Sequence, residues 1–228
     1  MRRRWWVLGS VVVVAVLALV AGPWVYGTWI ATDDAPAASV STSGAQAATG
    51  DVNGTWRVDP GTAPNATAAG YTVHEVLNGA SVTVVGSTGE VDGQVTIDAD
   101  KLTAATVTVR VESIKIDNAR RDGQFAGNVM AVGTYPTARF TLDRPVDLSA
   151  LPTDGTTATL PATGTLELRG VTRPVTVDVK VLHSGQALIA SGSIPVTWKD
   201  FGVQPPSLGF VTVDDAGTVD FLVHLATS

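Results

Sequence analysis

The stretch GTLELRGVTRPVTVDVKV, residues 164–181, decides the fold because its apolar residues recur at every second position. Leu166 and Leu168 alternate with polar residues in its first part. The valines at 175, 177, 179 and 181 alternate with polar residues in its second part. Alternation with period two is typical of strands that have one buried face and one wet face. The stretch therefore predicts β-strands that contribute one face to a core.

The same alternation recurs along most of the chain beyond residue 53, which predicts an all-β domain. In AGYTVHEVL, residues 69–77, the side chains of Tyr71, Val73 and Leu77 share one face. Glu75 is a charged exception on that apolar side, and His74 lies on the opposite face. With turn-rich stretches between them, roughly eight to ten such strands are expected.

Strands with one apolar face can bury it in a sandwich or in a closed barrel, and a barrel also removes the sheet edges. Periodicity by itself does not choose between these two architectures. Glycines within the strands, at Gly93, Gly164 and Gly192, favour the tight bends of a barrel.

One segment departs from the alternation, RRDGQFAGNVMAVGTYPTARF at residues 120–140. Phe125, Val129 and Val132 recur at spacings of four and three, which predicts a helix of about three turns between strands. One interpretation is a plug at a barrel end, with Phe125 and Met130 buried. The alternative is a lid or an element that faces a ligand.

The N-terminus predicts a membrane element. Three arginines precede an uncharged apolar run at residues 5–30, about 26 residues, where roughly 20 suffice to cross a bilayer. We expect residues 1–30 to be an uncleaved, single-pass anchor with its N-terminus in the cytoplasm and the domain outside. The alternative is a signal peptide, cleaved near residues 35–39, and a secreted protein.

Residues 31–53 predict a flexible linker between the anchor and a domain at residues 54–228. They are rich in Ala, Ser, Thr, Gly and Asp, and Val40 and Val52 are the only large apolar residues. Two valines are too few to form a core of their own.

Charge and composition argue against several classes of function. The formal net charge of −6 argues against nucleic acid as a partner, because phosphates require the opposite sign. The chain has no cysteine, and its three histidines do not gather, so we predict no metal site, no cofactor and no catalytic residues. His183 ends a strand on its apolar side, where it could contact a ligand head. A binding or carrier protein is therefore expected, with a ligand-free interaction module of the cell envelope as the first alternative and an enzyme acting on envelope lipids as the second.

Six motifs occur in an order that resembles the YceI-like, polyisoprenoid-binding family. They are WRVDP, GYTVHEV with VGSTGEVDGQVTID, RVESIKIDNARRDGQF, YPTARF, GTLELRGVTRPVTVDV and WKDFGV, and the resemblance extends to the C-terminal VDFLVHLAT. It implies an eight-stranded antiparallel, lipocalin-like barrel. It also implies a tunnel for a long isoprenoid chain, whose polar head lies near the mouth, in a protein exported to the cell envelope or periplasm.

The resemblance and the strand phases together name candidate site residues. Arg121 and Asp122 match the family's Arg-Asp pair, and Arg121 is a candidate partner for a phosphate or for Asp122 itself. Glu75 stands where the family has a histidine. The head-group candidates are Arg121 and His183. Candidates that line the tunnel are Tyr71, Val73, Val107, Val109, Phe125, Met130, Phe140, Leu166, Trp198 and Phe221. The identity of the ligand and the oligomeric state stay open.

Overall fold

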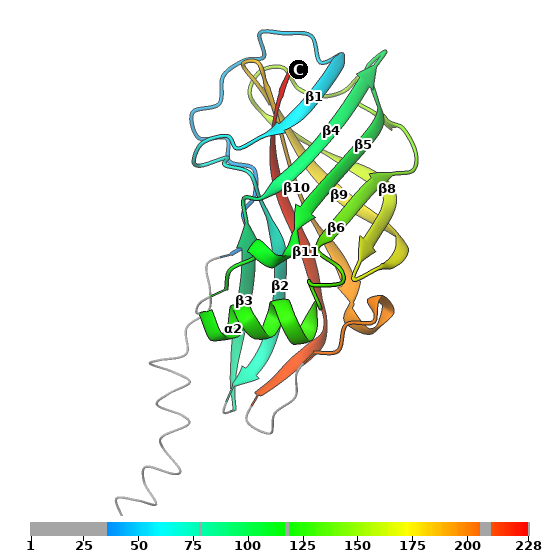
Figure 1. Cartoon of the computed structure of the whole chain (residues 1–228). Helices are drawn as coiled ribbons and strands as arrows, with labels where there is room; N and C mark the ends of the chain where they lie inside the picture. Colours follow the sequence, from blue (N-terminus) through cyan, green and yellow to red (C-terminus); the bar gives the residue numbers. More distant parts are fainter. Residues whose placement is uncertain (1–35, 78, 117–118, 206–210, 228) are drawn as a thin grey trace, which may run out of the picture.

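The computed structural model describes residues 36–77, 79–116, 119–205 and 211–227, and nearly all of its regular structure is antiparallel strand (Figure 1). The strands are β1 (Gly54–Asp59), β2 (Ala68–Leu77), β3 (Ala80–Thr88), β4 (Val91–Asp98), β5 (Lys101–Arg110), β6 (Thr137–Leu142), β7 (Val146–Asp147), β8 (Thr157–Leu168), β9 (Val171–Ser184), β10 (Ala187–Thr197) and β11 (Val211–Thr227). The helical elements are η1 (Val111–Ser113), α2 (Ala119–Gln124), η2 (Phe125–Val129) and η3 (Trp198–Phe201).

Eight of the strands close into a barrel. They follow one another in the order β1, β4, β5, β6, β8, β9, β10 and β11, and β11 then pairs with β1. Trp56 in β1, for example, is opposite Val95 of β4 on one side and Thr227 of β11 on the other. The choice between sandwich and barrel that periodicity left open is therefore settled in favour of the barrel that the resemblance implied.

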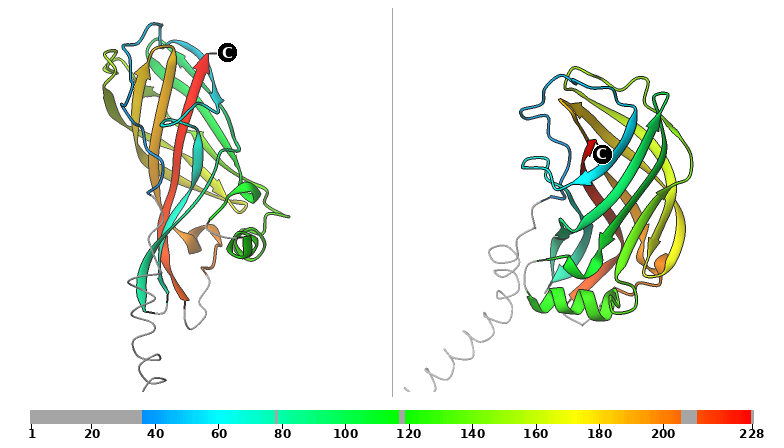
Figure 2. Two further views of the ribbon diagram at one scale, coloured as in Figure 1. Left: turned by 90° about the vertical axis from the view of Figure 1, so that its left-hand side faces the viewer. Right: turned by 45° about the horizontal axis from the view of Figure 1, so that its top comes forward.

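The hairpin of β2 and β3 extends the wall of the barrel at one end. β11 pairs with β1 through residues 224–227 and with β2 through residues 211–222, so β1 and β2 follow each other along one side of β11. β3 pairs with β2, and a single bridge from Ser87 to Lys115 connects it to the chain beyond β5. Figure 2 shows that α2 lies across this end of the barrel, beside β2, β3 and the beginning of β11.

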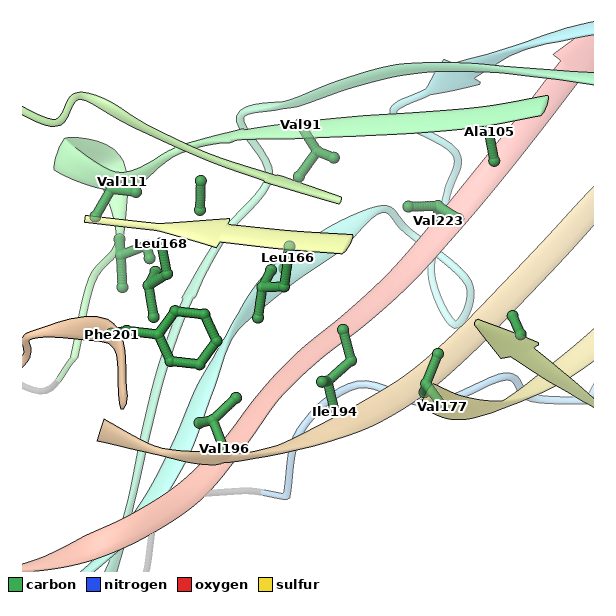
Figure 3. Packing of buried hydrophobic residues seen from close by; sticks show 14 of the residues in the cluster. Val91, Ala105, Val111, Leu166, Leu168, Val177, Ile194, Val196, Phe201 and Val223 are labelled. Carbon is green, nitrogen blue, oxygen red and sulfur yellow. The ribbon is translucent and has the colours of Figure 1, made fainter. Parts of the chain in front are cut away.

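The alternation in the sequence separates the interior from the outer surface as predicted. Leu166 and Leu168 of β8 are buried, whereas Glu167 between them is exposed. Figure 3 shows their side chains facing those of Ile194 and Val196, from β10, across the interior. Burial of apolar area at roughly 25 cal/mol per Å² is what stabilises such a barrel.

The predicted helix is present as α2, which continues without a break into the wider turn of η2. The Met130 amide donates to the Phe125 carbonyl oxygen at 2.9 Å, a bond from residue i to i−5. Phe125 and Met130 are both buried, as predicted for a plug. The segment leaves the helical conformation at Ala131, whose φ is +50°.

The predicted anchor at residues 1–30 lies outside the described residues, as does residue 35 of the alternative cleavage region at residues 35–39. Among the residues that are described, no helix combines the length and hydrophobicity needed to span a membrane.

Val40, in the segment at residues 31–53 that the sequence predicts to be a flexible linker, is buried. It is only 3% exposed and packs against Leu182, Ile189 and Leu222, whose side chains lie on the outer face of the barrel. Its amide donates to Ser191 Oγ at 3.1 Å. The expectation that Val40 has too little to bury against is wrong, because it counted the apolar residues of the linker alone. The apolar partners come from three strands that are far away in the sequence.

Hydrogen bonds hold the rest of this segment on the barrel. The Gln46 amide donates to Ser184 Oγ at 2.9 Å, and the amides of Ala48 and Thr49 donate to the carbonyl oxygens of Thr153 and Gly185 at 2.8 Å. Residues 40–49 are therefore attached to the loops and strands that they cross, and we call them the docked segment.

The docked segment is expected to contribute measurably to stability. Val40→Ala removes two buried methyl groups and should lower the free energy of unfolding by about 1–2 kcal/mol, measured by denaturant unfolding of the full chain. The control is Val76→Ala, because Val76 is 42% exposed and its replacement should change stability by less than about 0.5 kcal/mol. Equal effects of the two substitutions would contradict the importance of Val40 packing.

Candidate lipid-binding cavity

The barrel interior contains a cavity of about 700 Å³, lined mainly by aliphatic and aromatic side chains from strands all around the barrel. This volume lies within the roughly 300–1,000 Å³ typical of ligand pockets. All ten residues predicted to line a tunnel line this cavity: Tyr71, Val73, Val107, Val109, Phe125, Met130, Phe140, Leu166, Trp198 and Phe221. Strand phase indicated those on strands, and the helical segment supplied Phe125 and Met130. Their contact with a lipid stays a prediction.

An aromatic cluster occupies the end of the cavity beneath the helical segment. The ring of Tyr71, from β2, stacks on that of Phe125 with centroids 4.9 Å apart and planes 15° apart. The ring of Trp198, from η3, meets Tyr71 edge to face at 6.3 Å. These offset and edge-on arrangements are the favourable ones for aromatic rings.

Two glycines make room for the aromatic cluster. A Cβ atom at Gly86 would lie 2.5 Å from the Tyr71 ring, and one at Gly217 would lie 2.5 Å from the ring of Trp198. Real side chains do not approach so closely, so the positions of both rings require glycine on the neighbouring strands.

An ion pair forms the polar part of the same end. Arg121 Nη2, from α2, lies 3.1 Å from both carboxylate oxygens of Glu75, from β2. Glu75 is 4% exposed, whereas the side chain of Arg121 is partly exposed. Glu75 and Arg121 both line the cavity. The pair therefore attaches the helix to the barrel wall and neutralises a buried carboxylate.

The partner of Arg121 is not Asp122, one of the two partners predicted from the sequence. The Asp122 carboxylate instead accepts the Ile116 amide at 2.8 Å and lies 3.6 Å from Lys115 Nζ. The missed residue is Glu75, 46 positions away. The signal in the sequence was its place as a charge on the apolar face of a strand.

His183, the second head-group candidate, lies away from this polar end. It is 2% exposed and is opposite Leu188, with its ring 6.3 Å from that of Trp56 and edge to face with it. It is not one of the cavity-lining residues. Burial lowers the pKa of His183 below its ordinary value, and the nearby charge of Asp51 opposes this shift.

The strand registers show how far His183 lies from Glu75, the partner of the other head-group candidate, Arg121. Glu75 is opposite Val213 of β11, and Leu188, the partner of His183, is opposite Leu225 of β11. Of the 12 steps from residue 213 to residue 225, a bulge between Val213 and Gly217 takes up two, and the other ten correspond to roughly 33 Å of strand. Glu75, Arg121 and His183 therefore do not form one convergent set of ionisable groups, which the enzyme hypothesis requires.

Metal ligands do not gather in the described part of the chain. Within it, no group of three or more His, Cys, Asp or Glu residues is arranged to hold a metal ion. The chemistry that the cavity offers is an apolar surface with a charged pair and polar aromatic groups at one end.

Replacement of Arg121 should loosen the helical segment. Arg121→Gln leaves the Glu75 carboxylate buried without its cation, and the free energy of unfolding should fall by about 1–3 kcal/mol, less than for a fully buried pair because Arg121 is partly exposed. Hydrogen exchange of the α2 amides should also become faster. The matched control is Arg120→Gln, since Arg120 is the exposed neighbour. If Arg120→Gln produced the same loss, the Glu75 pair would not be the cause.

The lowered pKa of His183 predicts how the stability of the protein depends on pH. Because its pKa is lowered in the folded state, the unfolded chain takes up a proton first as the pH falls below about 6.5. Stability should therefore be complete above pH 6.5 and decline below it, by at most about 1.4 kcal/mol per pH unit from this group. His183→Phe should remove this part of the slope between pH 6.5 and 5. His74→Gln, at an exposed histidine, should keep it, and equal slopes in all three proteins would refute the assignment.

Comparison with known proteins agrees with the geometry. Residues 56–225 match the family model of the YceI-like domain. A UPF0312 protein of Pseudomonas paraeruginosa is 32% identical over 131 residues, which are 52% of this chain and 63% of that protein. A UPF0312 protein of Shewanella denitrificans is 31% identical over 130 residues, or 53% of this chain and 64% of that protein. The match thus spans less than two thirds of the length of these relatives.

Two solved structures share the fold. The crystal structure of Burkholderia cenocepacia BcnA is 25% identical, with a TM-score of 0.55, and the match covers 70% of this chain and 96% of that one. The polyisoprenoid-binding domain from Saccharophagus degradans, implicated in plant cell wall breakdown, is 17% identical with a TM-score of 0.57, and the match covers 76% of this chain and 98% of that one. With the family model matched over most of the chain and the barrel and cavity in place, the chain belongs to the YceI-like domain family.

Proposed function

We propose that this protein binds a long-chain lipid of the isoprenoid type in its barrel and acts as a lipid-binding or carrier protein. The observation that carries the proposal is the cavity of about 700 Å³, which is lined mainly by apolar side chains and has the ion pair of Glu75 and Arg121 at the end near α2. A hydrocarbon chain gains about 0.8 kcal/mol for each CH₂ group that it buries. A long apolar chain with one polar end is the kind of ligand that matches this distribution.

The comparisons support the same class of ligand. The chain belongs to the YceI-like family, and a protein of the same fold is described as a polyisoprenoid-binding domain. The rival hypothesis, a ligand-free structural module of the envelope, expects an interior filled by its own side chains. The cavity argues against that rival.

We also propose that the barrel is held on the outer side of the cell membrane by the N-terminal segment. The support is the sequence alone, an apolar run at residues 5–30 that follows three arginines. Mass spectrometry of the intact, membrane-extracted protein tests this directly. An N-terminus near residues 35–39 would replace the anchor with a cleaved signal peptide.

The binding proposal is tested by filling the cavity. Ala105 and Ala104 are neighbours on β5, but Ala105 lines the cavity and Ala104 is exposed on the outer face. Ala105→Phe should lower the amount of lipid that co-purifies with the full chain by about tenfold, as a loss of roughly 1.4 kcal/mol would do. Extraction and mass spectrometry measure this amount. Ala104→Phe adds the same ring on the outer face of the barrel and should leave the amount of co-purified lipid unchanged.

Two results would overturn the binding proposal. One is a wild-type protein that carries no lipid and takes up none when an isoprenoid is supplied. The other is equal lipid content in Ala105→Phe and Ala104→Phe, provided that both variants are folded.

A further inference from the structure

The end of the barrel near β1 is closed by buried side chains. Trp56 and His183 are directly opposite Val95 and Leu188, which line the cavity, so all four side chains point to the interior. Trp56 and His183 do not line the cavity themselves, and their rings pack edge to face in the core at this end. Around the barrel, each of the eight strands is paired on both sides. A ligand that left through this end or through the wall would therefore have to displace buried rings or break strand pairing.

The opposite end is covered by two helical elements that differ in how firmly they are packed. η3 contributes Trp198 and Phe201 to the core, and Val203, which follows it, is also buried. α2 has no buried residue. It therefore buries little apolar area, and we expect it to separate from the barrel more readily than η3.

The segment formed by α2 and η2 lies where the strand wall is incomplete. Among the described residues, β3 has only the bridge from Ser87 to Lys115 on its open side. α2 crosses this end of the barrel (Figure 2), and Arg121, Gln124 and Phe125 line the cavity from the segment. A movement of this segment would connect the cavity with solvent without breaking a strand pair.

The specific contacts of α2 in the described part of the chain are polar. Arg121 binds Glu75, and the Asp122 carboxylate accepts the Ile116 amide at 2.8 Å. Buried apolar packing starts only at Phe125, after the end of α2. A hydrogen bond contributes only modestly to stability, and desolvation offsets most of the attraction of a partly buried ion pair. The turns of α2 are therefore weakly attached.

Two glycines weaken the helical conformation of the segment without any steric need. Gly123 lies in α2 and Gly127 in η2, and a Cβ atom at either position would meet no neighbouring side chain or strand within 4 Å. Neither glycine has a positive φ. Glycine is the poorest helix former after proline, because it loses the most conformational freedom. At Gly86 and Gly217 the neighbouring rings require glycine, whereas here its physical consequence is a helix that unwinds more easily.

We infer that residues 119–130, which we call the gate segment, are the entrance to the cavity, and that they open by local loss of helical structure. The gate segment unwinds from α2 onwards, exposes the cavity at the incomplete part of the wall, and folds back over the bound lipid. This inference rests on the proposed function and adds the route by which the ligand enters and leaves.

The test compares the rate of lipid uptake with the amount bound at equilibrium. Delipidated full-length protein is mixed with a tritiated twenty-carbon isoprenoid alcohol, and the label bound to protein is measured at successive times. Gly123→Ala and Gly127→Ala should each slow uptake about fivefold, which corresponds to about 1 kcal/mol of added helix stability at 25 °C. The amount bound at equilibrium should not change, because neither glycine lines the cavity. The control is Gly50→Ala, at an exposed glycine outside the helices that also has room for a Cβ atom, and it should leave the rate unchanged.

The outcomes separate this inference from the proposed function. A wild-type protein that takes up no alcohol would refute the proposed function itself. Uptake at the wild-type rate by both Gly123→Ala and Gly127→Ala would refute the gate alone. A lower amount bound at equilibrium in these variants would also contradict it, since a gate changes the rates of entry and exit and not the affinity.

Asp122→Ala tests the gate in the opposite direction. It removes the acceptor of the Ile116 amide, and Asp122 does not line the cavity. Uptake should become about two- to tenfold faster, as expected for one hydrogen bond, with the same amount bound at equilibrium. The matched control is Asp154→Ala, because the exposed carboxylate of Asp154 accepts the Thr156 amide at 3.0 Å in the loop before β8, and its loss should not alter the rate. Unchanged uptake in a folded Asp122→Ala would show that α2 does not control access to the cavity.

Discussion

The arrangement of the whole barrel depends on the pairing of one strand, β11. Its 17 residues are too many for either of its shorter neighbours, so it pairs with β1 along one part and with β2 along another. Where β1 is the neighbour, the sheet closes through β4 and every strand has two partners. Where β2 is the neighbour, the hairpin of β2 and β3 continues the wall, and β3 has no second strand beside it among the described residues, only the bridge from Ser87 to Lys115. The barrel is therefore closed by strands at one end and completed by a helix at the other.

The helix at the second end is held by a few specific contacts. Phe125 stacks on Tyr71 inside the barrel, and Arg121 binds Glu75 at the wall. A buried ion pair is a poor source of stability, because desolvation offsets most of its attraction, but it specifies where the partners must meet. The same contacts that complete the wall also form the polar end of the cavity. The same residues therefore determine both how this end is completed and where the cavity is polar.

The outer surface shows a second consequence of strand alternation. The residues that face outward on β9, β10 and β11 include Leu182, Ile189 and Leu222, which would otherwise expose an apolar patch. The docked segment covers them with Val40 and attaches to neighbouring loops through its backbone amides. A polar, low-complexity sequence can therefore be ordered where a folded domain supplies the apolar partners.

The sequence by itself determined which residues face the interior, because side-chain direction in a strand depends only on parity, a local property. This is why the tunnel residues predicted from strand phase, from Tyr71 to Phe221, line the cavity. Phe125 and Met130, which also line it, come from the helical segment, which was predicted from a spacing of three and four, an equally local property. Parity also placed His183 on the inner side, but it contains no information on height along the barrel. Only the registers of β9, β10 and β11 put His183 far from the polar end.

The tertiary structure alone decided which distant groups meet. Glu75 binds Arg121, and Val40 packs against Leu222. Both pairs are far apart in the sequence, so no local pattern indicates the contact. It also decided that the interior contains a cavity, since a lumen filled by its own side chains would show the same alternation in sequence. Packing depends on the volumes of side chains from all eight strands at once, and that sum is known only when the barrel is closed.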